Sequence, residues 1–288
     1  MRKRFFTIQD SEYRYETRFI AEDWVVAPTG GELVCLSDYL DESKESINES
    51  FALPIKPSKL VCLGKTYAAH AKEFDGTVQQ PEPCIFLKSP EALCATTDNV
   101  VLPPGSRALD YEVELAVVIG GRLKNASVEA VKKAIYGYTL MCDYSEREMQ
   151  LERGGQWTKG KSYESFAPVG PVFVTADEVP EPDNIDLELY VNGELRQKGN
   201  TSDLIMPIYE LVAYVSQFMT LVPGDVISTG TPAGVALGMK EPRYLKEGDV
   251  VNWGSPVFGF VEQKVVVDSR PIIEDGVDTK NFKRPIII

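Results

Sequence analysis

The most informative stretch of this sequence is DYEVELAVVIG, residues 110–120. Residues 116–119 are apolar on both faces of an extended chain, which predicts a strand in the interior of a sheet. Side chains alternate along a strand, so Glu112 and Glu114 share one face, roughly 7 Å apart. An isolated E-x-E pattern is more often a solvated face. On an interior strand, however, two unpaired carboxylates are costly, and a shared divalent cation would remove that cost.

A third acid, Asp143, ends the apolar run of residues 135–142. An acid at the end of a buried strand often lines a cleft, although an aspartate that caps a turn is about equally common. Three oxygen ligands favour Mg²⁺, Mn²⁺ or Ca²⁺ over zinc, which prefers nitrogen and sulfur. The chain contains one histidine, so it is poorly equipped for zinc.

Residues 143–162 follow directly, and we expect a helix that is capped near Ser145 and ends at the two glycines 154–155. Arg147 and Gln150 are three residues apart, so they share one helical face. Lys161 follows the glycines. These residue types are common on protein surfaces. If they face the three acids instead, they could hold an anionic substrate against a metal.

The single histidine, His70, lies three residues before Glu73, and the two are neighbours if this segment is helical. A carboxylate beside an imidazole orients the ring and favours its charged form, which is the pattern of a general base. A pair on a surface helix is the ordinary alternative. Without other support, H-x-x-E is therefore weak evidence of a site.

The stretch VISTGTPAGV, residues 226–235, is an apolar strand that ends in a Gly/Pro turn with hydroxyl side chains. Such a turn presents backbone N–H groups and hydroxyls to an anion. A tight turn that binds no ligand explains the pattern equally well.

The chain divides by pattern into a small strand-rich domain, residues 1–57, and a larger one, residues 58–288. Residues 24–36 predict a hairpin, and the charged residues 38–49 predict a solvated helix or linker. Prolines 54 and 57 mark the boundary.

In the larger domain we expect mostly strands, with a few helices. A helix is predicted at residues 127–134, with Ser127 as its N-cap, and another at residues 207–219 with one apolar stripe. Residues 187–195 predict a hairpin that turns at Asn192-Gly193. A regular β-α-β alternation is absent, which argues against a doubly wound fold.

Composition narrows the class of function. Thirty Lys and Arg against 43 Asp and Glu give a net charge of −13, which argues against a nucleic-acid partner or an anionic membrane. The basic start lacks the apolar core of a signal peptide, and the apolar runs are far shorter than the ~20 residues of a membrane span. Five cysteines without a C-x-x-C pair indicate reduced thiols, which favours a cytoplasmic protein.

Taken together and in this order, the motifs resemble the fumarylacetoacetate hydrolase family. The resemblance covers about residues 59–267, and the combination is specific although each piece alone is weak. The matching residues are Gly64, Tyr67, His70 and Glu73, then residues 85–88 (IFLK), residues 110–115, Asp143, Ser145, Arg147, Gln150, Trp157, Gly160, Lys161 and residues 229–235.

The resemblance implies an α+β, mainly β fold: a mixed β-roll catalytic domain behind a small N-terminal domain, usually in a homodimer. It implies a Mg²⁺ or Mn²⁺ ion bound by three acids, a water-activating dyad on a mobile lid helix, and further residues that contact the substrate. The metal ligands are Glu112, Glu114 and Asp143; the catalytic residues are His70, Glu73 and Lys161; the substrate-binding residues are Tyr67, Arg147, Gln150, Thr229, Gly230 and Thr231. One departure is Thr66, where members often have asparagine, and this puts substrate contacts at that position in doubt.

Members of the family act on small 2-oxo acids. The implied activity is hydrolysis of a C–C bond in an acylpyruvate or other β-diketo acid, and residues 145–155 and 238–246 look most like a branch that degrades sugar acids. That branch includes 2,4-diketo-3-deoxy-L-fuconate hydrolases and proteins labelled ureidoglycolate lyase. Decarboxylation of oxaloacetate, isomerisation or hydration of 2-oxo-dienoates, and an inactive binding scaffold are the alternatives. Cleavage between two carbonyls leaves an enolate, for which a metal and Lys161 would supply positive charge.

Overall fold

The computed structural model describes residues 57–75 and 82–267, and the backbone of five strands before them; the side chains of residues 74 and 75 are not described. The five strands are β1 (Lys3–Gln9), β2 (Tyr15–Ala21), β3 (Trp24–Val26), β4 (Leu33–Cys35) and β5 (Ser50–Ala52). The hairpin expected in residues 24–36 is confirmed, since β3 and β4 pair antiparallel. The helix or linker expected at residues 38–49 lies outside the described residues.

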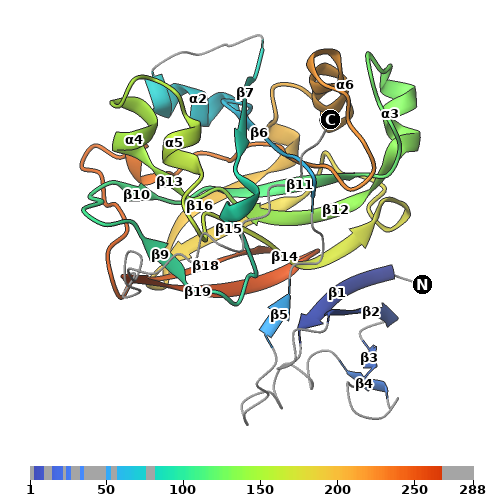
Figure 1. Ribbon diagram of the computed structural model, residues 1–288, viewed down its shortest axis with the longest axis horizontal. Helices are drawn as coiled ribbons and strands as arrows, with labels where there is room; N and C mark the ends of the chain where they lie inside the picture. The colour runs from blue at the N-terminus through green and yellow to red at the C-terminus, as the bar shows by residue number, and fades with distance from the viewer. Residues whose placement is uncertain are drawn as a thin grey trace, which may run out of the picture.

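A large mixed sheet forms the centre of the molecule (Figure 1). Its main path runs β4-β3-β2-β1-β14-β12-β11-β17-β6-β7, with β5 beside β1 and β8 beside β14. The β6–β17 and β8–β14 pairs are parallel, and the rest are antiparallel. The strands after β5 are β6 (Leu60–Gly64), β7 (Cys84–Lys88), β8 (Leu93–Cys94), β11 (Val113–Ile119), β12 (Ile135–Cys142), β14 (Ala167–Thr175) and β17 (Val226–Ser228).

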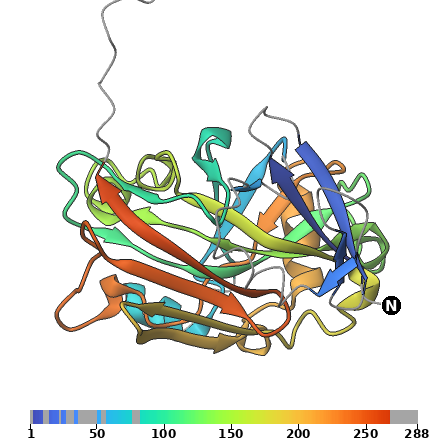
Figure 2. The same ribbon diagram turned by 90° about the horizontal axis from the view of Figure 1, so that it is seen from below.

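A second sheet lies across the large one, as Figure 2 shows. Its order is β16-β15-β18-β19-β9, from β9 (Val100–Leu102), β15 (Asp186–Val191), β16 (Glu194–Asn200), β18 (Val250–Ser255) and β19 (Gly259–Val267). The predicted hairpin turn is confirmed, because Asn192 (φ 50°) and Gly193 (φ 78°) join β15 to β16. A two-residue ladder pairs β10 (Leu109–Asp110) with β13 (Ser145–Glu146).

The helices are short and gather on the side of the molecule away from the N-terminal strands, at the top of Figure 1. They are α2 (Ala68–Asp75), α3 (Val128–Ala134), α4 (Arg147–Leu151), α5 (Thr158–Lys161) and α6 (Ile208–Phe218), with 3-10 turns η1 (Pro90–Ala92), η2 (Ala176–Glu178), η3 (Thr201–Asp203) and η4 (Ala236–Gly238). Ser127 caps α3 as predicted, and the apolar stripe of α6 is buried.

The start of α4 differs from the prediction. Glu146 is the N-cap, and its carboxylate accepts from the backbone N–H of Met149. Ser145, the predicted cap, is still paired with Asp110 across the β10–β13 ladder, and its hydroxyl donates to the carbonyl of Asp143. The helix therefore begins only after that ladder ends.

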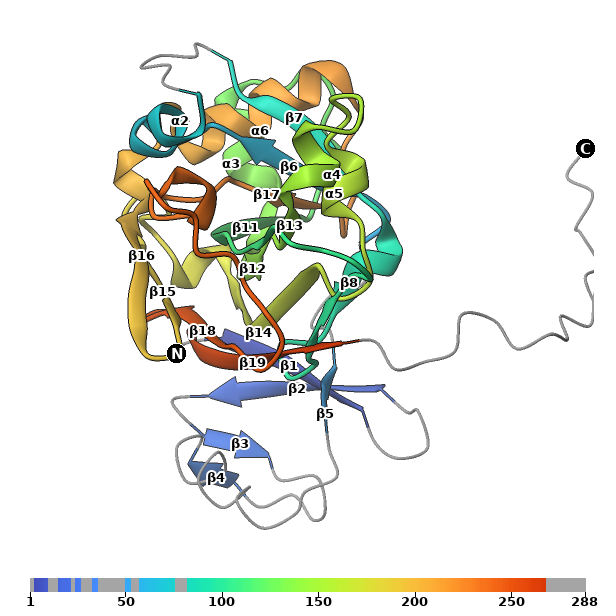
Figure 3. The same cartoon turned by 90° about the vertical axis from the view of Figure 1, so that its left-hand side faces the viewer.

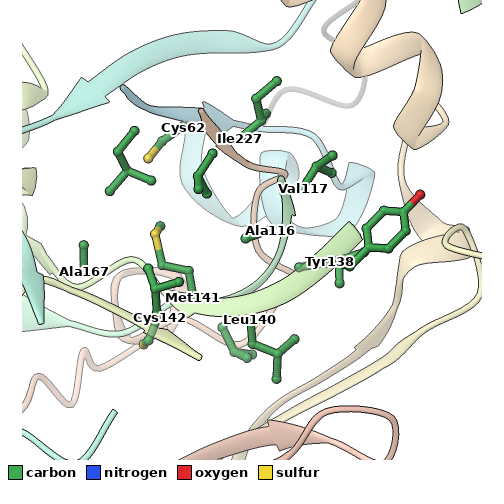
Figure 4. Packing of buried hydrophobic residues seen from close by; sticks show 14 of the residues in the cluster. Cys62, Ala116, Val117, Tyr138, Leu140, Met141, Cys142, Ala167 and Ile227 are labelled. Carbon is green, nitrogen blue, oxygen red and sulfur yellow. The ribbon is translucent and has the colours of Figure 1, made fainter. Parts of the chain in front are cut away.

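The core surrounds β11, a central strand of the large sheet. All seven residues of β11 are buried, which confirms the predicted interior strand. Figure 4 shows apolar side chains from β6, β11, β12, β14 and β17 converging in one cluster. The described cysteines Cys62, Cys84, Cys94 and Cys142 are free thiols. Among the described residues, no helix has the length and apolar character needed to span a membrane. The result is the mainly β, α+β architecture that the sequence predicted.

The N-terminal strands gather at one edge of the molecule (Figure 3). They continue the large sheet, because β1 pairs antiparallel with β14 at Arg4↔Val174 and Phe5↔Phe173. The division into residues 1–57 and 58–288 stays a prediction.

Candidate active site

Three acids meet at one end of the β11–β12 pair. Glu112 lies just before β11, Glu114 lies within it, and Asp143 follows β12. The register pairs Val113 with Cys142, and the backbone N–H of Asp143 donates to the carbonyl of Glu112 at 2.8 Å. This pairing brings one oxygen of each of the three carboxylates within 4.8 Å of the others. All three side chains are buried.

Buried cations surround these acids. Lys161 at the end of α5 donates through Nζ to Glu112 Oε2 at 2.6 Å and to Asp143 Oδ2 at 2.7 Å. Lys88 at the end of β7 donates to the other oxygen of Asp143, Oδ1. Arg147 donates through Nη2 to Glu112 Oε1 at 2.7 Å. Glu112 and Asp143 are thus each held by two positive side chains.

Glu114 has a different environment from the other two acids. Its Oε2 accepts from the hydroxyl of Ser228 and from the backbone N–H of Gly230 at 2.9 Å. Burial raises its pKa well above the usual value, and the nearby Asp143 and Glu112 raise it further. Burial would also raise the pKa of Glu112, but Arg147 and Lys161 outweigh it and hold that pKa below its usual range. One acid of the three therefore lacks sufficient compensating positive charge.

These residues fit a divalent cation. Four carboxylates are buried around the cluster against three cations: Asp110, Glu112, Glu114 and Asp143 against Lys88, Arg147 and Lys161. The ammonium of Lys161 already bridges two of the candidate ligands, so the cluster is built to take a positive charge between its members. Carboxylate oxygens are the donors that Mg²⁺ and Mn²⁺ prefer.

A cavity of about 10 Å³, room for roughly one water, opens onto two of the acids, Glu112 and Glu114. It is lined by Leu63, Gly64, Lys65, His70, Phe86, Glu112, Glu114, Gln150, Trp157, Lys161 and Thr231. Phe86 and Trp157 form an aromatic wall with ring centroids 5.3 Å apart, and Lys161 Nζ lies 4.9 Å from the Phe86 ring centre. The site thus combines acids, a cation and an apolar side.

His70 and Glu73 are both on α2, as the sequence predicted. His70 is buried, with Nε2 3.9 Å from Glu112 Oε1 and Nδ1 3.8 Å from Glu73 Oε2. Both separations exceed hydrogen-bond length. The Glu73 carboxylate instead accepts from the backbone N–H of Gly234, at 3.0 and 3.1 Å. Gly234 has a φ of +110°, and a Cβ there would lie 2.0 Å from the carbonyl oxygen of Arg196, so the contact requires glycine.

Arg147 and Gln150 are one turn apart on α4 but have different positions. The guanidinium of Arg147 donates to Asp110, Gln150 and Glu112, and it is not among the residues that line the cavity. Gln150 lines the cavity, and its Nε2 has no hydrogen-bond partner among the described residues. Arg147 holds Glu112 from behind, whereas Gln150 faces the open side.

The turn after β17 is folded back onto β11. The hydroxyls of Thr229 and Thr231 donate to the carbonyls of Leu115 and Val113, each at 2.9 Å. The N–H of Gly230 goes to Glu114. Of these turn residues, Thr231 alone is among those that line the cavity.

The two neighbouring residues of the first motif, Thr66 and Tyr67, are also buried. Thr66, the one noted departure from the motif resemblance, donates to the carbonyl of Thr229 at 2.8 Å. Tyr67 is not among the residues that line the cavity, and its hydroxyl has no hydrogen-bond partner in the described part of the chain.

The sequence motifs do not indicate a role for three supporting residues, Lys88, Ser228 and Gln197. Lys88 lies within the IFLK motif and Ser228 at the end of β17, and nothing in the sequence distinguishes either from its neighbours. Gln197 donates to the Thr231 hydroxyl and the Pro232 carbonyl, and accepts from the N–H of Val113. Gln197 lies in β16 between a hairpin turn and a glycine. Nothing in this local sequence indicates its contact with Val113, which is 84 residues away in the chain.

The curled mixed sheet with its buried acidic cluster is the fold and site of one enzyme family. Residues 59–266 match the fumarylacetoacetate (FAA) hydrolase C-terminal family, and the chain belongs to it, as the motifs indicated. A Bos taurus relative, oxaloacetate tautomerase FAHD2B, mitochondrial, is 43% identical over 219 residues, or 75% of this chain and 69% of that protein.

Solved structures agree with this assignment. The fumarylacetoacetate hydrolase of Exiguobacterium antarcticum superposes with a TM-score of 0.78 at 30% identity, covering 92% of this chain and 100% of that one. The 5-carboxymethyl-2-hydroxymuconate delta-isomerase of Mycobacterium smegmatis gives a TM-score of 0.73 at 32% identity, covering 93% and 100%. These relatives are a hydrolase, an isomerase and a tautomerase, so the family's members are enzymes of more than one reaction type.

Proposed function

We propose that this protein is a divalent-metal-dependent hydrolase that cleaves a C–C bond in a small acylpyruvate or other β-diketo acid. The observation that carries the proposal is the meeting of Glu112, Glu114 and Asp143 in one buried cluster. Two of these acids, Glu112 and Glu114, line a cavity together with His70 and Lys161. Mg²⁺ or Mn²⁺ held by the three acids would supply positive charge where the enolate of the substrate develops.

The chain's own residues would do the rest of the chemistry. Lys161 would turn its ammonium from Glu112 and Asp143 toward the carboxylate or enolate of the substrate, because its position between the two acids is the one a metal would take. Gln150 also lines the cavity and would offer its N–H₂ group to a substrate oxygen. Thr231, another lining residue, would be a further contact.

His70 is the candidate base for the water that attacks the distal carbonyl. Its ring lines the cavity, and the Glu73 carboxylate lies 3.8 Å from Nδ1. A shift of about 1 Å would bring the pair to hydrogen-bond length, and such contacts often tighten only when substrate binds. Glu73 would then hold the ring and stabilise the imidazolium. Arg147 holds Asp110 and Glu112, Gly230 holds Glu114, and Thr229 ties the turn to Leu115. Contacts of these three residues and of Tyr67 with the substrate stay a prediction.

Tautomerisation or decarboxylation of oxaloacetate is the second candidate. It is favoured by the bovine relative, which is named an oxaloacetate tautomerase. Both reactions need enolate stabilisation but no attacking water. Isomerisation of a 2-oxo-dienoate is a further alternative, since the mycobacterial structure is that of a 5-carboxymethyl-2-hydroxymuconate delta-isomerase.

One panel of substrates distinguishes these reactions. The purified protein with added Mg²⁺ is incubated with acylpyruvates, diketo sugar acids and oxaloacetate, and pyruvate release is measured together with loss of the oxaloacetate enol in the ultraviolet. Release of pyruvate from acylpyruvates supports hydrolysis. Enol loss from oxaloacetate without any acylpyruvate cleavage would replace the first proposal by the second.

A homodimer stays a prediction from the family resemblance, and a cytoplasmic location stays a prediction from the cysteine pattern. Light scattering coupled to size-exclusion chromatography tests the homodimer, with an expected mass of twice the 32.0 kDa chain.

A further inference from the structure

Lys88 is a buried cation that the proposed chemistry does not use. It ends β7, an outer strand of the large sheet, and pairs there with Leu60. Its side chain is fully buried and runs inward past the ring of Phe166, with Nζ 5.9 Å from the ring centre. A lysine is rarely buried completely unless its charge is matched.

The ammonium of Lys88 has three acceptors, which is the number of its donors. One is Oδ1 of Asp143; the others are the backbone carbonyls of Lys161, at 2.6 Å, and Tyr144, at 3.0 Å. Lys88 therefore contacts both partners of one ion pair: the carboxylate of Asp143 and the main chain of Lys161.

Lys161 contacts the same Asp143 carboxylate in a different way. Its Nζ donates to Oδ2 of Asp143 and to Oε2 of Glu112, so one ammonium lies between these two oxygens. A metal between the same acids would compete with Lys161 for them. Lys88 occupies the remaining oxygen of Asp143, Oδ1, so it does not compete for Oδ2.

We propose that Lys88 is a positioning residue that leaves Asp143 one oxygen, Oδ2, for the metal and fixes the end of α5 so that Lys161 stays directed into the cavity. This inference rests on the metal site of the proposed function. Supporting groups of this kind typically change metal affinity or activity about 10- to 100-fold when they are removed.

The two lysines give opposite predictions for metal affinity. Lys161→Met removes a competitor for two ligand oxygens, so Mn²⁺ should bind with a lower Kd than in the wild type. Lys88→Met frees the Asp143 carboxylate to rotate, so Mn²⁺ should bind with a Kd raised about 10- to 100-fold. Both variants lose one positive charge beside the same acid, which makes each the matched control for the other.

The experiment is a Mn²⁺ titration of the full chain, followed by the electron paramagnetic resonance signal of free Mn²⁺ and by calorimetry, without substrate. The metal site itself is tested by comparing the wild type with Asp143→Ala, which should abolish Mn²⁺ binding. A failure of the metal site can therefore be told apart from a failure of the proposal for Lys88. If Lys88→Met tightens Mn²⁺ binding as Lys161→Met does, Lys88 acts only through its charge and the proposal is wrong.

A second variant and a structure cover the case in which Lys88→Met does not fold. Lys88→Gln keeps a hydrogen-bond donor without the charge, and should weaken Mn²⁺ binding less than Lys88→Met. Unchanged Mn²⁺ affinity in Lys88→Gln would overturn the proposal. A crystal structure of the Mn²⁺-loaded wild type should show Asp143 bound through Oδ2 alone, and coordination through both oxygens would also overturn it.

Discussion

The acidic cluster and helix α2 contribute to the same cavity but are supported very differently. Every residue of β11 is buried, and the acids are held by strand register and by buried cations. Of the six described side chains of α2, His70 and Ala71 are buried, and Glu73 anchors the helix through the single N–H of Gly234. The charge-stabilising half of the site is thus built into the sheet, while the candidate base is carried by a helix whose described side chains are mostly exposed or half-buried. Substitutions in the two regions should separate the two halves of the reaction.

The largest effect is expected at the cluster. Asp143→Ala removes a candidate metal ligand, and with the metal the site would lose several kcal/mol of enolate stabilisation. Turnover of every substrate should therefore fall by roughly 10³-fold or more. EDTA should do the same to the wild type, and added Mg²⁺ should restore it. Glu129→Ala on the exposed face of α3 is the control. Full turnover by Asp143→Ala in the presence of EDTA would end the metal proposal.

His70→Gln should separate the reactions that need an attacking water from those that do not. Loss of a general base typically costs about 10²–10⁴-fold, so acylpyruvate hydrolysis should fall by this factor. Any oxaloacetate decarboxylation should largely persist, and Mn²⁺ affinity should stay near that of the wild type. The two activities are compared at saturating Mg²⁺. An equal fall in both means that His70 positions the substrate or the helix, and no fall in either removes His70 from the mechanism.

Metal affinity should rise with pH. The pKa of Glu114 is raised by its burial and by Asp143 and Glu112. Without metal, this carboxyl therefore keeps its proton at pH values at which an exposed glutamate is already ionised. A metal must displace that proton in order to bind. Below the raised pKa, affinity should increase by up to about tenfold per pH unit for one displaced proton. The stability of the metal-free protein should depend on pH in the opposite sense. The folded state binds this proton more tightly than the unfolded state does, so the contribution of Glu114 to stability declines as pH rises from the usual glutamate pKa to the raised one.

Calorimetric Mn²⁺ titrations at several pH values check this dependence, together with proton release into a weakly buffered solution. Glu114→Gln should bind Mn²⁺ weakly and lose most of the pH dependence. An affinity that does not change with pH would mean that Glu114 is already ionised in the metal-free protein.

The smallest effect is expected at Glu73. Glu73→Gln keeps an oxygen that can accept from the N–H of Gly234, so α2 should stay in place and the melting temperature should hardly change. The lost charge lies 3.8 Å from His70. At about 4 Å such a charge is worth about 1 kcal/mol even in bulk water, which is roughly fivefold in hydrolysis rate. A loss as large as that of His70→Gln would show that the two residues act as a unit.

Local patterns predicted much of the fold. The apolar run of residues 116–119, the N-cap Ser127 and the turn at Asn192-Gly193 each depend on neighbours within a few residues, and each was confirmed. The cap of α4 was misplaced by one residue because Ser145 is paired with Asp110, which lies 35 residues earlier. The β1–β14 pairing joins positions about 170 residues apart, and no local pattern encodes it.

The site shows the same division. Alternation along one strand placed Glu112 and Glu114 on one face, and the end of the next strand supplied Asp143. The sequence could not show that Arg147 holds Asp110 and Glu112 from behind, since a guanidinium reaches a carboxylate or a substrate equally well. Nor could it show that the N–H of Gly230 is used by Glu114 rather than by an anion.

The partners of Glu114 also constrain when the site can form during synthesis. Its carboxylate is satisfied by Ser228 and Gly230, which follow it by 114 and 116 residues. A chain made from the N-terminus carries all three acids and all three nearby cations well before β17 exists, because Lys161 precedes it by more than sixty residues. Until β17 inserts between β6 and β11, the nascent sheet lacks a central strand and keeps an unsatisfied acid at its open edge. Assembly of the cavity is therefore a late event, governed by long-range strand pairing rather than by the short helices.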